Sequence, residues 1–127
     1  DIPGTGFSIG VDRLLFAILQ LGQIKVDSKK PAIVCVMDKK YLKNYYEILK
    51  ILRDNGINSE IFLDSEKNLG KQLTYANKRG CPVAVICGEN EFKENTITLK
   101  NLLGAKGENN QITIPKENFI NEIKKYI

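Results

Sequence analysis

The chain has 127 residues, of which 43% are hydrophobic and 27% charged, a balance typical of one folded domain with a short appendage. Its net charge of +4 permits contact with phosphate groups without requiring it. There is no histidine, no apolar run long enough to span a membrane and no secretory signal at the start, which excludes Cys–His and Ser–His catalysis and the commonest metal ligand. We therefore expect a cytoplasmic protein with no metal site that contacts neither membranes nor DNA.

The three cysteines, Cys35, Cys81 and Cys87, show no C-x-x-C spacing. Cys35 and Cys87 lie inside apolar runs, where a reduced cysteine behaves as a small hydrophobic residue. We expect all three to pack in the interior of a protein from a reducing compartment, without disulfides or a catalytic role.

The first predicted elements are a short strand and glycine turn over residues 4–10, followed by a strongly apolar helix over residues 11–21. Leucine and isoleucine cover most of the surface of this helix, a pattern typical of a helix buried on several sides. The chain beside it is too short to bury it, so we expect the sequence to begin inside a larger protein. Residues 23–30 are polar and predict a linker at a domain boundary.

From Pro31 onward, apolar strands alternate with amphipathic helices. Strands are predicted over residues 32–37, 57–63, 82–87, 96–99 and 111–114. Helices are predicted from about Tyr41 to Asn55, from a cap at Ser65 to Gly80, and from Pro115 onward. This order predicts an α/β fold: a five-stranded mixed sheet flanked by three helices, with strand order 2-1-3-4-5. Residues 88–95 are expected to form a polar turn, and Gly104 and Gly107 to mark a loop.

One motif is the run Gly6-Phe7-Ser8-Ile9-Gly10-Val11-Asp12-Arg13-Leu14-Leu15. A strand that leads through glycine into a helix lets the backbone approach a flat ligand, and an arginine there can bind phosphate, although most such junctions bind nothing. The run resembles motif 3 of the class II aminoacyl-tRNA synthetases in the form typical of histidyl enzymes. The resemblance implies ATP and Mg²⁺ as cofactors of an intact enzyme, with Gly10 in the strand beneath the adenine and Arg13 at the ATP phosphates. The family usually has glutamate where Asp12 stands.

The rest of the chain, residues 31–127, resembles the anticodon-binding domain shared by histidyl, prolyl, threonyl and glycyl enzymes. The stretches 69–80, 85–91 and 96–102 are similar to the histidyl version. The resemblance implies that residues 1–22 are the end of a class II catalytic domain joined to the anticodon-binding domain. It further implies that the intact protein is a homodimeric ligase for tRNA(His). This chain is only part of that enzyme and would not be catalytic alone.

Reading an anticodon requires polar side chains beside unstacked bases, with lysine and arginine near the phosphates. A histidine anticodon is guanine-rich; a carboxylate can accept from guanine N1 and N2, and a lysine can donate to O6 or N7. The resemblance implies anticodon contacts by Glu91 and Lys100, and phosphate contacts are expected from Lys71 and Arg79. Without the resemblance, the simpler interpretation of the region around Glu91 is a polar turn, and that of Lys71 and Arg79 is a solvated helix face.

Two alternatives come from other classes of protein. A synthetase-like regulatory or accessory protein would use the same domain for RNA binding or dimerisation. The replacement of the usual glutamate by Asp12 slightly favours this alternative. A receiver or flavodoxin-like domain is disfavoured. A receiver needs an acidic cluster, but only Asp64 accompanies Asp38 at the strand ends, and residues 37–40 lack the glycine of a phosphate loop.

Overall fold

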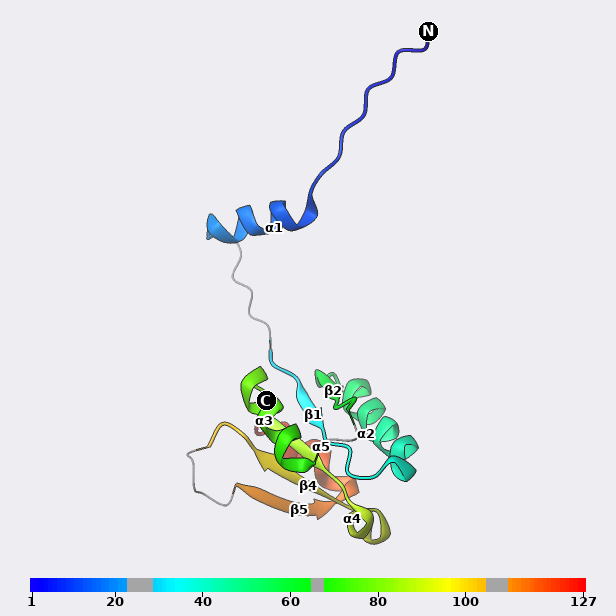
Figure 1. The fold of residues 1–127 in the computed structure, drawn as a ribbon. Helices are drawn as coiled ribbons and strands as arrows, with labels where there is room; N and C mark the ends of the chain where they lie inside the picture. The colour runs from blue at the N-terminus through cyan, green and yellow to red at the C-terminus, as the bar shows by residue number, and fades with distance from the viewer. Residues whose placement is uncertain (23–28, 65–67, 105–109) are drawn as a thin grey trace.

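The structure, a computed structural model, describes residues 1–22, 29–64, 68–104 and 110–127. Within these residues one sheet contains five strands in the order β2-β1-β3-β4-β5 (Figure 1). The strands are β1 (Ala32–Val34), β2 (Ser59–Ile61), β3 (Val83–Ile86), β4 (Thr96–Asn101) and β5 (Gln111–Pro115). β1 runs parallel to β2 and β3, whereas β4 is antiparallel to both β3 and β5. The predicted fold class and strand order are confirmed.

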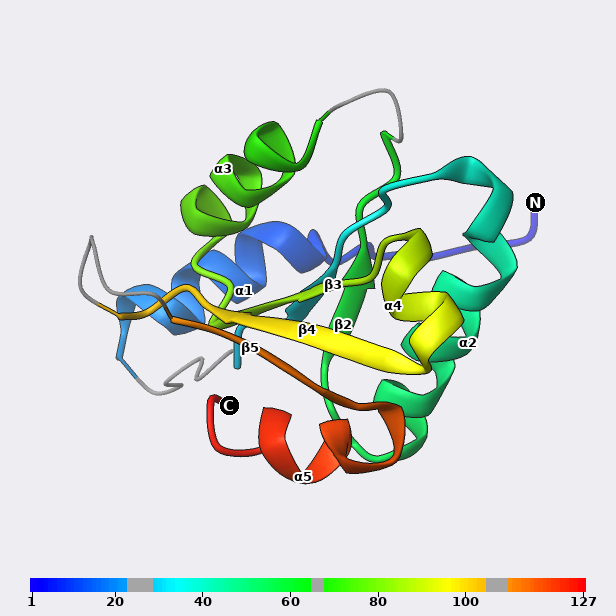
Figure 2. The ribbon, with the colours of Figure 1, turned by 90° about the horizontal axis from the view of Figure 1, so that it is seen from below.

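Helices cover both faces of this sheet. They are α2 (Leu42–Asp54), which follows the 3-10 turn η1 (Lys39–Tyr41), α3 (Leu69–Arg79), and α5 (Phe119–Ile123), which follows the 3-10 turn η2 (Lys116–Asn118). α2 leads from β1 outward to β2, and α3 leads back across β1 to β3. Because right-handed crossovers in opposite directions place their helices on opposite faces, α3 lies on one side of the sheet and α2 with α5 on the other (Figure 2).

The core consists of two apolar layers separated by the sheet. Alternate residues of β1 and β3 point into each layer, which is why both strands are apolar throughout. β4 differs, since Ile97 and Leu99 enter the layer under α2 and α5 while Thr98 and Lys100 alternate with them and face the α3 side. This one-sided strand leaves polar side chains on a face of the sheet.

Residues 88–95, predicted as a polar turn, instead form the short helix α4 (Glu89–Glu94). Phe92 explains the difference, because its ring centroid lies 4.7 Å from that of Tyr41 and 5.2 Å from that of Tyr45. Asn95 ends the helix in the left-handed conformation at φ 54°, which asparagine tolerates better than most residues. Packing against α2 therefore turns a polar sequence into a helix.

The predicted apolar N-terminal helix is present as α1 (Val11–Gln20), but residues 1–10 form no strand. A strand needs a partner to pair its backbone groups, and no described strand pairs with this segment. α1 buries none of its own residues and stands apart from the sheet in Figure 1. No helix in the described part of the chain has the length and apolar character that a membrane crossing requires.

Two details of the sequence prediction, the cap at Ser65 and the loop glycine Gly107, lie outside the described residues. The cap of α3 is Asn68, whose Oδ1 accepts from the backbone N–H of Lys71 at 3.0 Å. The helix stops at Gly80 in the left-handed conformation, as its sequence predicted.

Candidate nucleic-acid interface

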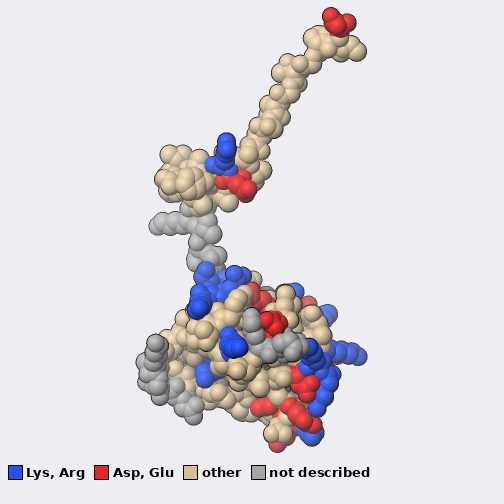
Figure 3. Space-filling model, in the orientation of Figure 1, with Lys and Arg blue, Asp and Glu red and all other residues tan. Residues whose placement is uncertain are grey.

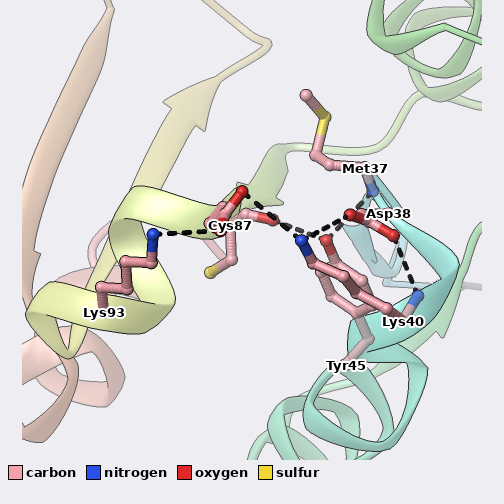
Figure 4. Close-up of polar contacts among 7 residues, drawn as sticks. Met37, Asp38, Lys40, Tyr45, Cys87 and Lys93 are labelled. Atoms are coloured by element: carbon pink, nitrogen blue, oxygen red, sulfur yellow. Dashed lines mark hydrogen bonds and ion pairs between the residues drawn. The ribbon is translucent and has the colours of Figure 1, made fainter.

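In α/β sheets the usual ligand crevice lies outside the carboxyl ends of neighbouring strands whose connections diverge, here β1 and β3. In this chain that crevice is closed by side chains. The Tyr45 hydroxyl donates to the carbonyl of Cys87 at 2.7 Å and accepts from the N–H of Met37 at 3.1 Å (Figure 4). From the other face, the buried Gln72 amide pairs with both the N–H and the carbonyl of Val36, at 2.9 and 2.7 Å. The backbone groups that would meet a ligand are already paired.

A group of charged side chains lies above the closed crevice and joins η1 to α4. Lys40 is 3.3 Å from Asp38 and 3.4 Å from Glu89, and Glu89 is 3.0 Å from Lys93 (Figure 4). The hydrogen bond from the Lys40 backbone lowers the pKa of Asp38, and the one from Lys93 lowers the pKa of Glu89. These exposed pairs add little stability individually. Among the described residues no cluster of cysteine and carboxylate side chains could hold a metal ion.

Glu91 holds the turn between β3 and α4 together. Its Oε2 accepts from the backbone N–H of Gly88 at 2.8 Å, as a glutamate in the first turn of a helix commonly does. Its Oε1 lies 3.5 Å from the Thr98 hydroxyl on β4, a long contact. A carboxylate has about four acceptor sites. Glu91 therefore has a structural role and still has acceptor capacity for a ligand.

Lys100 lies on the same face of β4 as Thr98, because side chains two residues apart in a strand point the same way. Across the β4–β5 pair, Thr98 is opposite Thr113 and Lys100 is opposite Gln111. The two threonine hydroxyls are 2.8 Å apart. We call this face, made of Glu91, Thr98, Lys100, Gln111 and Thr113, the polar strip.

The polar strip lies beyond the cover of α3. The apolar layer under that helix reaches Ala84 and Ile86 of β3, with Leu102 at its margin. Lys100 is half-buried, while Gln111 and Thr113 are exposed. Thr98 is buried, and Glu91 is half-buried like Lys100. The structure thus places the two residues expected to read the anticodon, Glu91 and Lys100, as half-buried side chains near the buried Thr98.

The sequence pattern alone does not identify Thr98, Gln111 and Thr113 as members of the polar strip. The alternation of threonine and aliphatic residues in 96–99 does indicate a strand with one polar face. It does not show which helix, if any, would cover that face, and this depends on where α3 ends.

The two residues expected to contact phosphates, Lys71 and Arg79, lie on α3. Arg79 forms a two-point pair with Glu60 of β2, with Nε–Oε1 and Nη2–Oε2 both at 3.2 Å, which raises the pKa of the guanidinium. Since β2 is three strands from β4, Arg79 is held roughly 14 Å from the polar strip. Lys71 is exposed and has no ion-pair partner among the described residues.

Gly10 and Arg13 lie at the start of α1, Gly10 as its N-cap residue and Arg13 in its first turn. Both are exposed, and the nearest atoms to a Cβ added at Gly10 would be those of the Arg13 side chain, at 3.7 Å. Among the described residues no second wall is present to enclose a nucleotide base. The described part of the chain therefore does not by itself form an ATP site.

The part of the chain that forms the five-stranded mixed sheet matches a known family. The sequence model described as the anticodon binding domain matches residues 30–126, and the chain belongs to that family. The resemblance noted in the sequence is thereby confirmed.

Within this family the chain is similar to histidyl enzymes. It is 84% identical over all 127 residues to the histidine–tRNA ligase of Pelagibacter ubique, of which it spans 27%. It is 46% identical over 107 residues, 84% of its own length, to that of a Jannaschia species, of which it spans 21%. Among solved structures, the histidyl-tRNA synthetase of Nostoc sp. PCC 7120 aligns with 92% of this chain and 28% of its own, at TM-score 0.69 and 28% identity. The chain therefore spans about a quarter of the length of its relatives.

Proposed function

We propose that this chain is the anticodon-binding part of a cytoplasmic histidine–tRNA ligase and recognises tRNA(His). The observation that carries the proposal is the 84% identity along the whole chain to a protein of that name. In this proposal residues 31–127 are the anticodon-binding domain, residues 23–30 the linker, and residues 1–22 the end of the catalytic domain. The whole enzyme, a homodimer, would join histidine to the tRNA.

The chemistry of the polar strip supports base reading. Glu91 offers a carboxylate that accepts from guanine N1–H and N2–H, and Lys100 a donor for O6 or N7. Both flank hydroxyl and amide groups of Thr113 and Gln111, which can serve as donors and acceptors. An unstacked guanine is the base that this pairing of a carboxylate with an ammonium fits best.

Phosphate contacts are proposed for Lys71 and Arg79. Lys71 is free of described ion pairs, whereas Arg79 is engaged with Glu60 through Nε and Nη2 and keeps Nη1 for a phosphate. Such contacts position the RNA without selecting its sequence.

ATP and Mg²⁺ are proposed as cofactors of the whole enzyme only. When bound there, ATP would supply the activation of histidine. Gly10 and Arg13 would contribute one edge of that site, and the remaining walls would come from residues outside this chain. The alternative of a non-catalytic accessory protein is not favoured, because the relatives that match along the chain are named as ligases.

The test is binding of anticodon stem-loops that carry either the histidine anticodon or a changed one. The variants are Glu91→Gln, which keeps the acceptor for Gly88 N–H but removes the charge, and Lys100→Met. Each should reduce the preference for the histidine anticodon by about 1–3 kcal/mol, because base-edge contacts carry the sequence information. Glu94→Gln, a change at an exposed glutamate of the same helix, is the control and should leave the preference intact.

Equal affinity of the wild-type chain for matched and changed anticodons contradicts the proposed function. Unchanged preference in both variants, with a preference in the wild type, contradicts the assignment of Glu91 and Lys100 alone.

A further inference from the structure

The outer side of α3 carries a second surface that the polar strip does not include. Lys71, Thr74, Tyr75 and Lys78 of the helix line a hollow of about 330 Å³ together with Phe62, which follows β2. An adjoining hollow of about 360 Å³ shares Phe62 and Tyr75. Tyr75 therefore forms the wall between two hollows beside the edge of the sheet.

The Tyr75 ring is held in a fixed position. It packs against the Phe62 ring in a T-shaped arrangement, with ring centroids 5.4 Å apart at 74°, and its hydroxyl donates to Glu60 at 3.3 Å. The side chain nevertheless remains 42% exposed. A ring fixed at both ends and open to solvent offers a flat surface without a further loss of side-chain entropy on binding.

Lys71 and Lys78 flank this ring, four residues before and three residues after Tyr75, and so lie on the same side of the helix. Both are exposed and have no ion-pair partner among the described residues. They are separated by seven residues, or about 10 Å along the helix. Figure 3, which views the molecule from the side of α3, shows separate basic side chains over this helix. The negative charge of nearby Glu60 is balanced by Arg79.

We propose that this surface binds an unpaired nucleotide of an RNA, with its base stacked on Tyr75 and its neighbouring phosphates at Lys71 and Lys78. A rigid aromatic ring between two lysines that have no ion pair with any described residue has the chemistry of a single-strand binding surface, in which stacking tolerates any base. The proposal rests on the proposed function, which supplies the RNA, and adds a contact that strengthens binding without reading sequence.

Helix α2 provides a matched control, because it carries the same trio at nearly the same spacing. Lys43 and Lys50 flank Tyr46, which is 49% exposed. Lys50, however, is paired with Asp54, and Tyr46 has no ring contact among the described residues. The two trios are thus alike in composition and exposure, and they differ in the fixed ring, the hollow and the ion pair of Lys50.

The experiment measures the dissociation constant of the 127-residue chain for anticodon stem-loops and for a loop-free RNA duplex. Tyr75→Ala should weaken matched and changed stem-loops by the same factor, roughly fivefold or more, and Tyr75→Phe should restore binding. Lys71→Ala with Lys78→Ala should lower the dependence of log affinity on log salt by about 1.4, as expected for two phosphates of a single strand. Tyr46→Ala and Lys43→Ala with Lys50→Ala should bind as the wild type does.

An abasic scan of the loop identifies the nucleotide. Removing the base that stacks on Tyr75 should weaken the wild-type chain and leave Tyr75→Ala unaffected. Wild-type affinity in Tyr75→Ala, or an equal loss with the loop-free duplex, overturns the proposal.

Failure of the proposed function gives a different result. In one outcome the wild type shows no anticodon preference while Tyr75→Ala still weakens binding of every stem-loop. This result would support RNA binding by the α3 surface and contradict recognition of the histidine anticodon. The Tyr75→Phe and lysine variants keep the surface testable should Tyr75→Ala unfold.

Discussion

Tyr45 and Gln72 are polar side chains that reach into the core from opposite faces of the sheet. Each satisfies backbone groups where β1 and β3 stop pairing: Gln72 pairs with the N–H and carbonyl of Val36, and Tyr45 with the N–H of Met37 and the carbonyl of Cys87. The consequence for function is that the usual crevice is filled, and the exposed polar surface shifts to the neighbouring strip on β4 and β5.

Tyr45→Phe should therefore lower the free energy of unfolding. The variant keeps the ring that packs on Phe92 but leaves the Cys87 carbonyl and the Met37 N–H without their partner, a loss of about 1–3 kcal/mol for buried groups. Urea denaturation, monitored by circular dichroism, measures this change in the free energy of unfolding. Tyr46→Phe, on the exposed side of the same helix, should change stability by less than about 0.5 kcal/mol. Equal stability of the two variants would show that water replaces the missing hydroxyl.

At the scale of elements, the three cysteines are buried in or next to β1 and β3. Burial raises the pKa of Cys35 and of Cys87 to about 12 and also raises the pKa of Cys81. The same cause raises the pKa of Tyr45. All four groups thus keep their protons in the folded chain at a pH where the unfolded chain releases them.

Stability should consequently fall as the pH rises above about 9, the ordinary pKa of a thiol. Between this pH and about 12 the unfolded chain binds fewer protons than the folded one, so alkali favours unfolding; below it the raised thiol pKa values cause no pH dependence. Urea denaturation at pH 7.5, 9 and 10 tests this. Cys35→Ala with Cys87→Ala should flatten the decline, and a stability that stays level or increases toward pH 10 would contradict the burial of these thiols.

At the scale of the whole molecule, α1 and the α/β domain are joined through residues 23–28, which lie outside the described residues. Phe16 of α1 is 64% exposed and Leu14 50%. Such an apolar helix favours association with another surface.

Deleting residues 1–24 should leave the thermal midpoint of the remaining domain within about 3 °C of the full chain, because none of the described residues in this segment is buried. The same deletion should reduce self-association, measured by sedimentation velocity, since the exposed apolar helix is lost. A large fall in the midpoint would mean that α1 packs on the domain and that the boundary at residues 23–30 is misplaced.

The sequence by itself determined the alternation of strands and helices, the strand order and the place of Glu91 and Lys100 near the end of the sheet. These follow from local periodicity, from the handedness of crossovers and from motifs contiguous in the chain. Only the tertiary structure decided that residues 89–94 form a helix, that Arg79 is bound to Glu60, and that Tyr45 and Gln72 close the crevice. Gln72 meets a residue 36 positions away and Tyr45 one 42 positions away. No local pattern specifies contacts of that separation, because they depend on how completely each helix covers its face of the sheet.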